Sequence, residues 1–200
     1  RIMRCVVYRP GSQAISSAFF GELDDIMDRL AAFVDPVYLV GDVNSIEWSP
    51  DGTRLVLDDF LAGRNRILVM NADGSDQRVL VDQGAPQGPG APAWSPDGTR
   101  IAYVSTPGSA GPNRGHFSFE VWMIEADGSE PTRLFHGECC IGDWDGPVWS
   151  PDGSRIAFFD DIDMSYGTWL IANADGSGEP QQITEIEARS WEQTISWGQE

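Results

Sequence analysis

The amino-acid sequence predicts a mainly β protein: a partial, open β-propeller of three four-stranded blades plus the start of a fourth, with an N-terminal β-α-β appendage. The main observation is an internal repeat. Trp-Ser-Pro-Asp-Gly-(Thr/Ser)-Arg occurs at 48–54, 94–100 and 149–155, and Ala-Asp-Gly-Ser follows each copy, at 72–75, 126–129 and 174–177. A fourth copy opens at Trp197. Repeats of about 40–50 residues rich in β-branched and aromatic residues are typical of propeller blades.

Each repeat contains the pattern of four strands. The first segment alternates, with Ile46 and Trp48 on one face, and a proline-aspartate-glycine turn follows it. The third segment of the repeat is apolar without alternation, and so are its counterparts Val121–Ile124 and Trp169–Ala172. An unbroken apolar run of this kind is typical of a strand that packs on both faces. Asp73-Gly74 is a hairpin signal before the fourth. The predicted strands are Ser45–Trp48, Arg54–Leu57, Arg66–Met70 and Gln77–Leu80.

The tryptophan and turn residues recur in register, so we assign them a structural role. We expect the three repeat tryptophans to be largely buried within their blades. The set comprises Trp48, Pro50, Asp51, Gly52, Asp73, Gly74, Trp94, Pro96, Asp97, Gly98, Asp127, Gly128, Trp149, Pro151, Asp152, Gly153, Asp175 and Gly176.

The second repeat carries extra residues at Pro107–Gly115, between its second and third strands. This Gly/Pro-rich loop shows no periodicity. Loops on propeller faces often carry binding sites. A tolerated surface insertion is the alternative, because long loops cost little additional closure entropy.

These repeats resemble the TolB-type, WD-like propeller repeats over about residues 45–197. The resemblance implies a protein-binding module outside the cytoplasm of bacteria, periplasmic or extracellular, although no signal peptide is visible in the chain. Related blades form the gating propeller of prolyl-oligopeptidase-type serine peptidases. The chain has no Gly-x-Ser-x-Gly nucleophile motif and no hydrolase domain.

Residues 1–44 lack the blade motif and predict a β-α-β unit. Arg4–Tyr8 and Val37–Val40 have the composition of strands. Between them, Phe19–Phe33 has apolar residues at spacings of three and four, which predicts an amphipathic helix. The strands of such a unit normally run parallel.

This segment resembles a short internal stretch of the endonuclease/exonuclease/phosphatase superfamily, of the retroelement endonuclease type. The matching words include Val7–Ser12 and Val37–Asn44. The resemblance implies that Asp42 and Asn44 match positions that activate the nucleophile and hold phosphate beside a divalent cation such as Mg²⁺. The family's upstream Glu and downstream Ser-Asp-His are absent, and neither His116 nor His136 lies in such a motif. We therefore expect an incomplete remnant without catalysis.

Composition limits the function classes. The chain has 200 residues and a formal net charge of −18. It contains 13 arginines and no lysine. An acidic surface disfavours nucleic acid, because phosphates require cationic partners. The absence of lysine excludes a Walker-type phosphate site and Schiff-base chemistry. Cys5, Cys139 and Cys140 form no C-x-x-C pattern and leave the redox state open. No apolar run is long enough to span a membrane.

The sequence therefore predicts a non-catalytic propeller module that binds a protein or small ligand on a blade face, as a fragment of a larger TolB-like protein. It predicts no cofactor and no metal, and it allows self-association through open blade edges. Two alternatives stay open: an accessory propeller of a serine peptidase, and a remnant of a Mg-dependent endonuclease. The predicted domains are 1–44 and 45–200, with blades at 45–82, 91–136 and 146–186 and a stub at 194–200.

Overall fold

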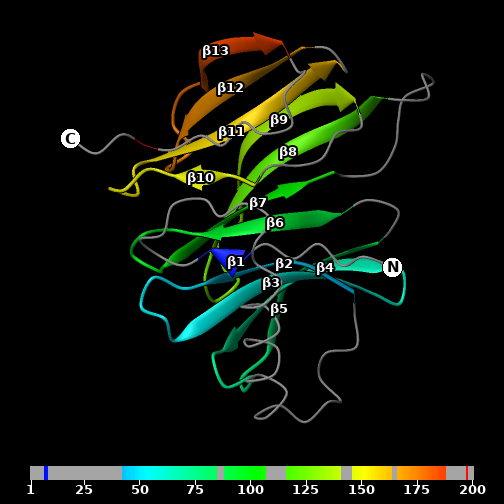
Figure 1. Cartoon of the computed structure of the whole chain (residues 1–200), viewed down its shortest axis with the longest axis vertical. Helices are drawn as coiled ribbons and strands as arrows, with labels where there is room; N and C mark the ends of the chain where they lie inside the picture. Colours follow the sequence, from blue (N-terminus) through cyan, green and yellow to red (C-terminus); the bar gives the residue numbers. More distant parts are fainter. Residues whose placement is uncertain are drawn as a thin grey trace.

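The computed structural model describes residues 7–8, 42–84, 88–106, 116–140, 146–163, 166–187 and 197, and this part of the chain is all β, without helix. The strands form three sheets that follow one another along the long axis of the molecule (Figure 1). Their bounds are β1 Val7–Tyr8, β2 Asp42–Trp48, β3 Arg54–Leu61, β4 Arg64–Asn71, β5 Arg78–Gly84, β6 Pro89–Trp94, β7 Arg100–Ser105, β8 His116–Glu125, β9 Thr132–Cys140, β10 Val148–Trp149, β11 Arg155–Asp163, β12 Tyr166–Asn173 and β13 Gln181–Glu187.

Each sheet is an antiparallel meander in sequence order. Blade 1 is β2-β3-β4-β5, blade 2 is β6-β7-β8-β9 and blade 3 is β10-β11-β12-β13. The mainly β, open, partial propeller predicted from the repeats is thus confirmed. The order follows from the turn residues, since each Pro-Asp-Gly and Asp-Gly pair closes a short antiparallel connection.

The main cores lie between blades. Val56, Ile67 and Val69 of blade 1 pack with Trp94 and other residues of blade 2. A larger cluster joins blades 2 and 3, with Phe119 and Val121 facing Ile156 and Phe158 across the interface. Because side chains alternate along a strand, Leu55 and Leu57 face away from Val56 into a separate cluster on the other side of blade 1. The third strands are therefore buried on both faces, as their unbroken apolar pattern predicted.

In the N-terminal part the structure describes Val7–Tyr8, which lie within the predicted strand Arg4–Tyr8, and the residues from Asp42 onward. β1 pairs in parallel with β2, with Val7 opposite Ile46 and Tyr8 opposite Glu47, so it extends the sheet of blade 1 to five strands. β2 begins at Asp42 and runs unbroken past the predicted boundary at 44/45. No turn residue separates Asn44 from Ser45, and β3 continues to pair with Val43. The predicted helix Phe19–Phe33, strand Val37–Val40 and loop Pro107–Gly115 lie outside the described residues.

Candidate functional site

The repeated Ser-Pro-Asp-Gly segment forms one turn geometry three times. Gly52, Gly98 and Gly153 each have a φ of 69°, a left-handed conformation that favours glycine. In blade 2 the Asp97 carboxylate accepts hydrogen bonds from the Ser95 hydroxyl at 2.6 Å and from the backbone N–H of Thr99 at 3.0 Å. The same bonds recur at Asp51 and Asp152. The serine hydroxyl and then the backbone N–H lower the pKa of Asp51 and of Asp152 to about 2.

The arginine that ends each motif joins its blade to the next one. Arg54 lies 4.6 Å from the centroid of the Trp94 ring and donates to the carbonyl of Gly98 at 2.8 Å. Arg100 repeats the arrangement over Trp149 at 5.0 Å and donates to Gly153 at 3.1 Å. A guanidinium over an indole face is a favourable cation–π contact. The motif is therefore an interface between blades as well as a turn within one.

This contact explains which tryptophans are buried. Trp94 and Trp149 are 4% and 7% exposed, as predicted, and each lies under an arginine of the preceding blade. Trp48 is partly buried, packs against the separate cluster on the other side of blade 1, and is more exposed than its two counterparts. Among the described residues no arginine covers the Trp48 ring. Arg155 continues the series by stacking over Trp197 at 5.3 Å.

The second repeated turn also packs against the preceding blade. Asp127 and Asp175 each accept a hydrogen bond from the backbone N–H two residues on, at 2.9 and 2.8 Å. A side chain at Gly128 would contact Leu80 of blade 1, and one at Gly176 would press against Thr132 of blade 2. Asp73 and Gly74 form the equivalent turn in blade 1, where Gly74 has a φ of 81°.

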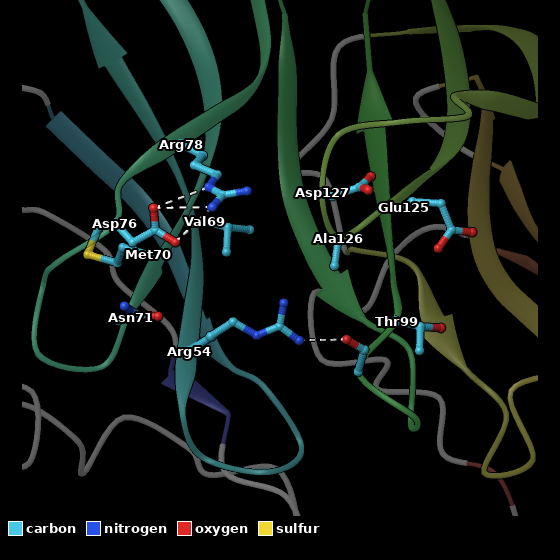
Figure 2. A pocket seen from close by; sticks show the side chains of 11 residues that line it. Arg54, Val69, Met70, Asn71, Asp76, Arg78, Thr99, Glu125, Ala126 and Asp127 are labelled. Carbon is cyan, nitrogen blue, oxygen red and sulfur yellow. Dashed lines mark hydrogen bonds and ion pairs between the residues drawn. The ribbon is translucent and has the colours of Figure 1, made fainter.

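A groove of 400 Å³ opens between blades 1 and 2 at this end of the sheets. In Figure 2, Arg54 and Arg78 enter it from blade 1, while Glu125, Ala126 and Asp127 stand on the opposite side. Its lining residues are Arg54, Val69, Met70, Asn71, Asp76, Arg78, Gly98, Thr99, Glu125, Ala126 and Asp127.

The equivalent place between blades 2 and 3 is bridged. There Arg100 donates through Nη1 to the carbonyl of Ala174 at 3.4 Å and lies 3.5 Å from the sulfur of Met123. The corresponding residues at the first interface are Arg54, Ala126 and Val69. Val69 is shorter than methionine, and no hydrogen bond joins Arg54 to Ala126 among the described residues. Equivalent residues therefore meet at both interfaces, but the hydrogen bond that bridges the second interface is missing from the first.

Both signs of charge line the groove. Arg78 pairs with Asp76 at 3.0 Å, and both side chains are more than half exposed. Across the groove, the hydroxyl and backbone N–H of Ser129 lower the pKa of Asp127, and the charge of Arg78 adds to this effect. Asp127 is therefore ionised at neutral pH. The groove offers charged hydrogen-bonding groups above the apolar side chain of Val69, whereas the Met70 side chain belongs to the cluster on the other side of blade 1.

The two residues that the nuclease resemblance singled out lie in β2. Asn44 has no partner in the β2–β3 register, because a bulge falls between Val43 and Ser45. The Asn44 side chain hydrogen-bonds Asp58, whose pKa is raised by burial. The resemblance to the endonuclease superfamily stays a hypothesis from sequence words alone.

Within the described part of the chain, no three His, Cys, Asp or Glu side chains come together as a metal site. The described residues form no helix with the length and apolar composition that a membrane crossing requires.

Sequence reasoning missed the arginines and Glu47. The arginine signal was available, since Arg54, Arg100 and Arg155 end every copy of the motif. Glu47 has no repeat signal, because alanine and valine occupy its position in blades 2 and 3. It accepts a 2.8 Å hydrogen bond from the backbone N–H of Trp94, and burial raises its pKa to about 7.

Comparisons with known proteins agree with this architecture. The chain is 32% identical over 95 residues to an uncharacterized peptidase, YuxL, of Bacillus subtilis, and 40% identical over 60 residues to the Tol-Pal system protein TolB of Thioalkalivibrio sulfidiphilus. These matches cover 48% and 30% of the chain. A putative TolB from Agrobacterium tumefaciens superposes with a TM-score of 0.56 at 23% identity over 76% of the chain.

The chain spans only part of each of these proteins: 14% of the peptidase, 12% of the curated TolB and 57% of the Agrobacterium structure. No family model matches the sequence. What the comparisons establish, together with the three meandering sheets, is a TolB-like propeller fold.

Proposed function

We propose that the chain is a non-catalytic portion of a TolB-like propeller that binds a protein or small ligand in the groove between blades 1 and 2. The observation that carries the proposal is the contrast between its two interfaces. Arg100 bridges the second to Ala174, whereas Arg54 leaves the first open over 400 Å³. A volume of this size lies within the range of ligand sites in proteins.

The chemistry of the groove supports binding without catalysis. Its lining contains no histidine, cysteine or lysine. Its hydroxyl, on Thr99, donates to Asp97 at 2.8 Å, and hydrogen bonds from Ser95 and Thr99 lower the pKa of that carboxyl, which makes it a weak base. Thr53 and Ser154 make the same bond in the other two blades, so this pair belongs to the turn. A nucleophile needs a stronger base than this one.

Exchanging the residues that distinguish the two interfaces tests the proposal. A mixed library of peptides and small polar molecules is screened against the chain by ¹H–¹⁵N NMR. We expect ligands that shift the amide signals of Gly98 and Ala126 and that bind about tenfold more weakly to Val69→Met, in which the longer side chain fills the groove. Met123→Val, the reverse exchange at the second interface, is the matched control. A library without such ligands, or ligands indifferent to Val69→Met, would disprove the proposal.

An accessory propeller of a serine peptidase is the second candidate, favoured by the similarity to the Bacillus peptidase over 95 residues. The gene that encodes the chain decides between the two functions. A hydrolase domain with a nucleophile elbow in the same reading frame would assign the blades to a peptidase. The nuclease hypothesis for Asp42 and Asn44 has its own test: we expect no plasmid cleavage with Mg²⁺ or Mn²⁺, and cleavage abolished by Asp42→Ala would establish it.

A further inference from the structure

We propose that the first repeat carries a binding site for an arginine side chain of a partner protein, formed by the Trp48 ring, the Gly52 carbonyl and the Asp73 carboxylate. We call these three groups the arginine seat of blade 1. The inference concerns a different surface from the groove and does not depend on the proposed function. It follows from the arginine contact that joins the other blades, because that contact shows what the repeated motif binds.

Each later repeat receives an arginine from the blade before it. In blade 2 the Gly98 carbonyl accepts a hydrogen bond from Arg54, whose guanidinium lies over the Trp94 ring. A Cβ added at Gly98 would lie 3.6 Å from Cδ of Pro50 and 3.8 Å from Nη2 of Arg54. Blade 3 repeats both contacts at Gly153, with distances of 3.6 and 3.9 Å. The tryptophan ring and the glycine carbonyl therefore form a receptor for a guanidinium on the side that faces the preceding blade.

Blade 1 presents the same groups without this contact. No described residue lies within 4 Å of a Cβ placed at Gly52, so the space that the guanidinium takes beside the other two glycines is open. The Gly52 carbonyl accepts no hydrogen bond from the part of the chain that the structure describes. Trp48 is also more exposed than its two counterparts, as expected for a ring without a covering arginine. Blade 1 thus has both the room and the hydrogen-bond acceptor that the contact requires.

A carboxylate stands beside the motif in each blade. Hydrogen bonds from Ser177 lower the pKa of Asp175, and the charge of Arg100 in the preceding blade adds to this effect. The arginine of one blade therefore acts on the acidic turn of the next. In blade 1, hydrogen bonds from Ser75 lower the pKa of Asp73, and no arginine among the described residues contributes. A backbone hydrogen bond of 2.8 Å joins this turn to the Ser-Pro-Asp-Gly turn, so an incoming guanidinium would meet an ionised carboxylate.

These three groups select arginine among cationic side chains. A guanidinium is planar and stacks on an indole while its edge donates to a carbonyl, whereas the ammonium group of lysine is compact and strongly hydrated. The formal charge of −18 attracts a cationic partner and repels a second copy of the chain. The partner that fits is therefore a different protein that exposes an arginine on its surface.

Three blocked amino acids test the inference by ¹H–¹⁵N NMR with the full chain. They are the N-acetyl amides of arginine, of lysine and of citrulline, which has the shape of arginine without its charge. The indole signal of Trp48 is assigned by its loss in Trp48→Phe. We expect the arginine probe to shift this signal and the amide signal of Gly52. It should bind at least about fivefold more tightly than the citrulline probe and about threefold more tightly than the lysine probe.

Two protein variants locate the effect. Asp73→Asn keeps an acceptor for Ser75 but removes the charge, and we expect it to weaken binding of the arginine probe by about threefold. Asp175→Asn is the equivalent change in blade 3, whose glycine already binds Arg100, and it should leave binding unchanged.

Several results would overturn the inference. They are equal binding of the arginine and citrulline probes, equal binding of the arginine and lysine probes, and unchanged affinity in Asp73→Asn. A Trp48 indole signal that shifts with protein concentration in the absence of a probe would show that an arginine of a second copy occupies the seat. That result would also overturn the assignment to a different partner protein.

Discussion

Trp94 and Trp48 occupy the same repeat position in different surroundings. Trp94 is 4% exposed beneath Arg54, whereas Trp48 is only partly buried. We expect Trp94→Ala to lower the free energy of unfolding by about 3–5 kcal/mol, as for a large buried aromatic side chain. Trp48→Ala should cost clearly less, since less surface returns to water. Urea denaturation of both variants measures the difference. Equal losses would show that the arginine contact does not determine how much each tryptophan contributes.

Glu47 gives the interface between blades 1 and 2 a dependence on pH. Burial raises its pKa from 4.5 to about 7, although the N–H of Trp94 opposes the shift. Between pH 4.5 and about pH 7, Glu47 loses its proton in the unfolded state but keeps it in the folded state. The free energy of unfolding therefore falls as the pH rises through this range, and it levels off above about pH 7. The loss amounts to about 3 kcal/mol at most. We expect Glu47→Gln to abolish most of the difference between denaturation midpoints at pH 5 and pH 8. A variant that keeps the wild-type slope would assign the dependence to another group.

Blades are coupled through the arginine that ends each motif. A double-mutant cycle on Arg100 and Trp149 isolates this contact, because each single substitution removes the same ring-to-guanidinium pair, with a separation of 5.0 Å. We expect a coupling energy of about 1–2 kcal/mol, measured from the unfolding free energies of the single and double alanine variants. Arg64 and Trp149, which lie in different blades and make no such pair, provide the control cycle. A coupling energy no larger than in that control cycle would show that the arginine does not stabilise the contact between blades, and that the motif acts only as a turn within its own blade.

The elements of the blades were largely predictable from the sequence, whereas the groove was not. Strand order and turns follow from local signals such as Pro50-Asp51-Gly52 and from the unbroken apolar pattern of Ile67–Met70, and these depend on near neighbours in the chain. The groove depends on a difference between repeats, Val69 in one interface and Met123 in the next. Such a difference acquires meaning only when the position of the facing arginine is known.

At the scale of the molecule, three blades held by nearest-neighbour contacts behave as a short repeat array, in which each interface adds its own stability. The outermost strands end the sheets, and they carry exposed apolar side chains: Val79 on β5 and Ile183 on β13 are each 47% exposed. Unpaired strand edges of this kind favour pairing with another chain. The formal charge of −18 opposes that association by repulsion between copies.

Salt therefore controls the state of the whole chain. Raising ionic strength from 50 to 500 mM shortens the screening length to only a few ångströms, about 4 Å, which removes the repulsion but not the apolar attraction. We expect the average mass seen by sedimentation equilibrium to rise with salt from that of the 21.9 kDa monomer. Val79→Lys and Ile183→Lys, tested separately, should suppress the rise at whichever edge mediates it, whereas Phe60→Lys, away from the outer strands, should not. A clean monomer at every salt concentration would mean that the strand edges are protected, and association that weakens with salt would mean that ion pairs hold the copies together.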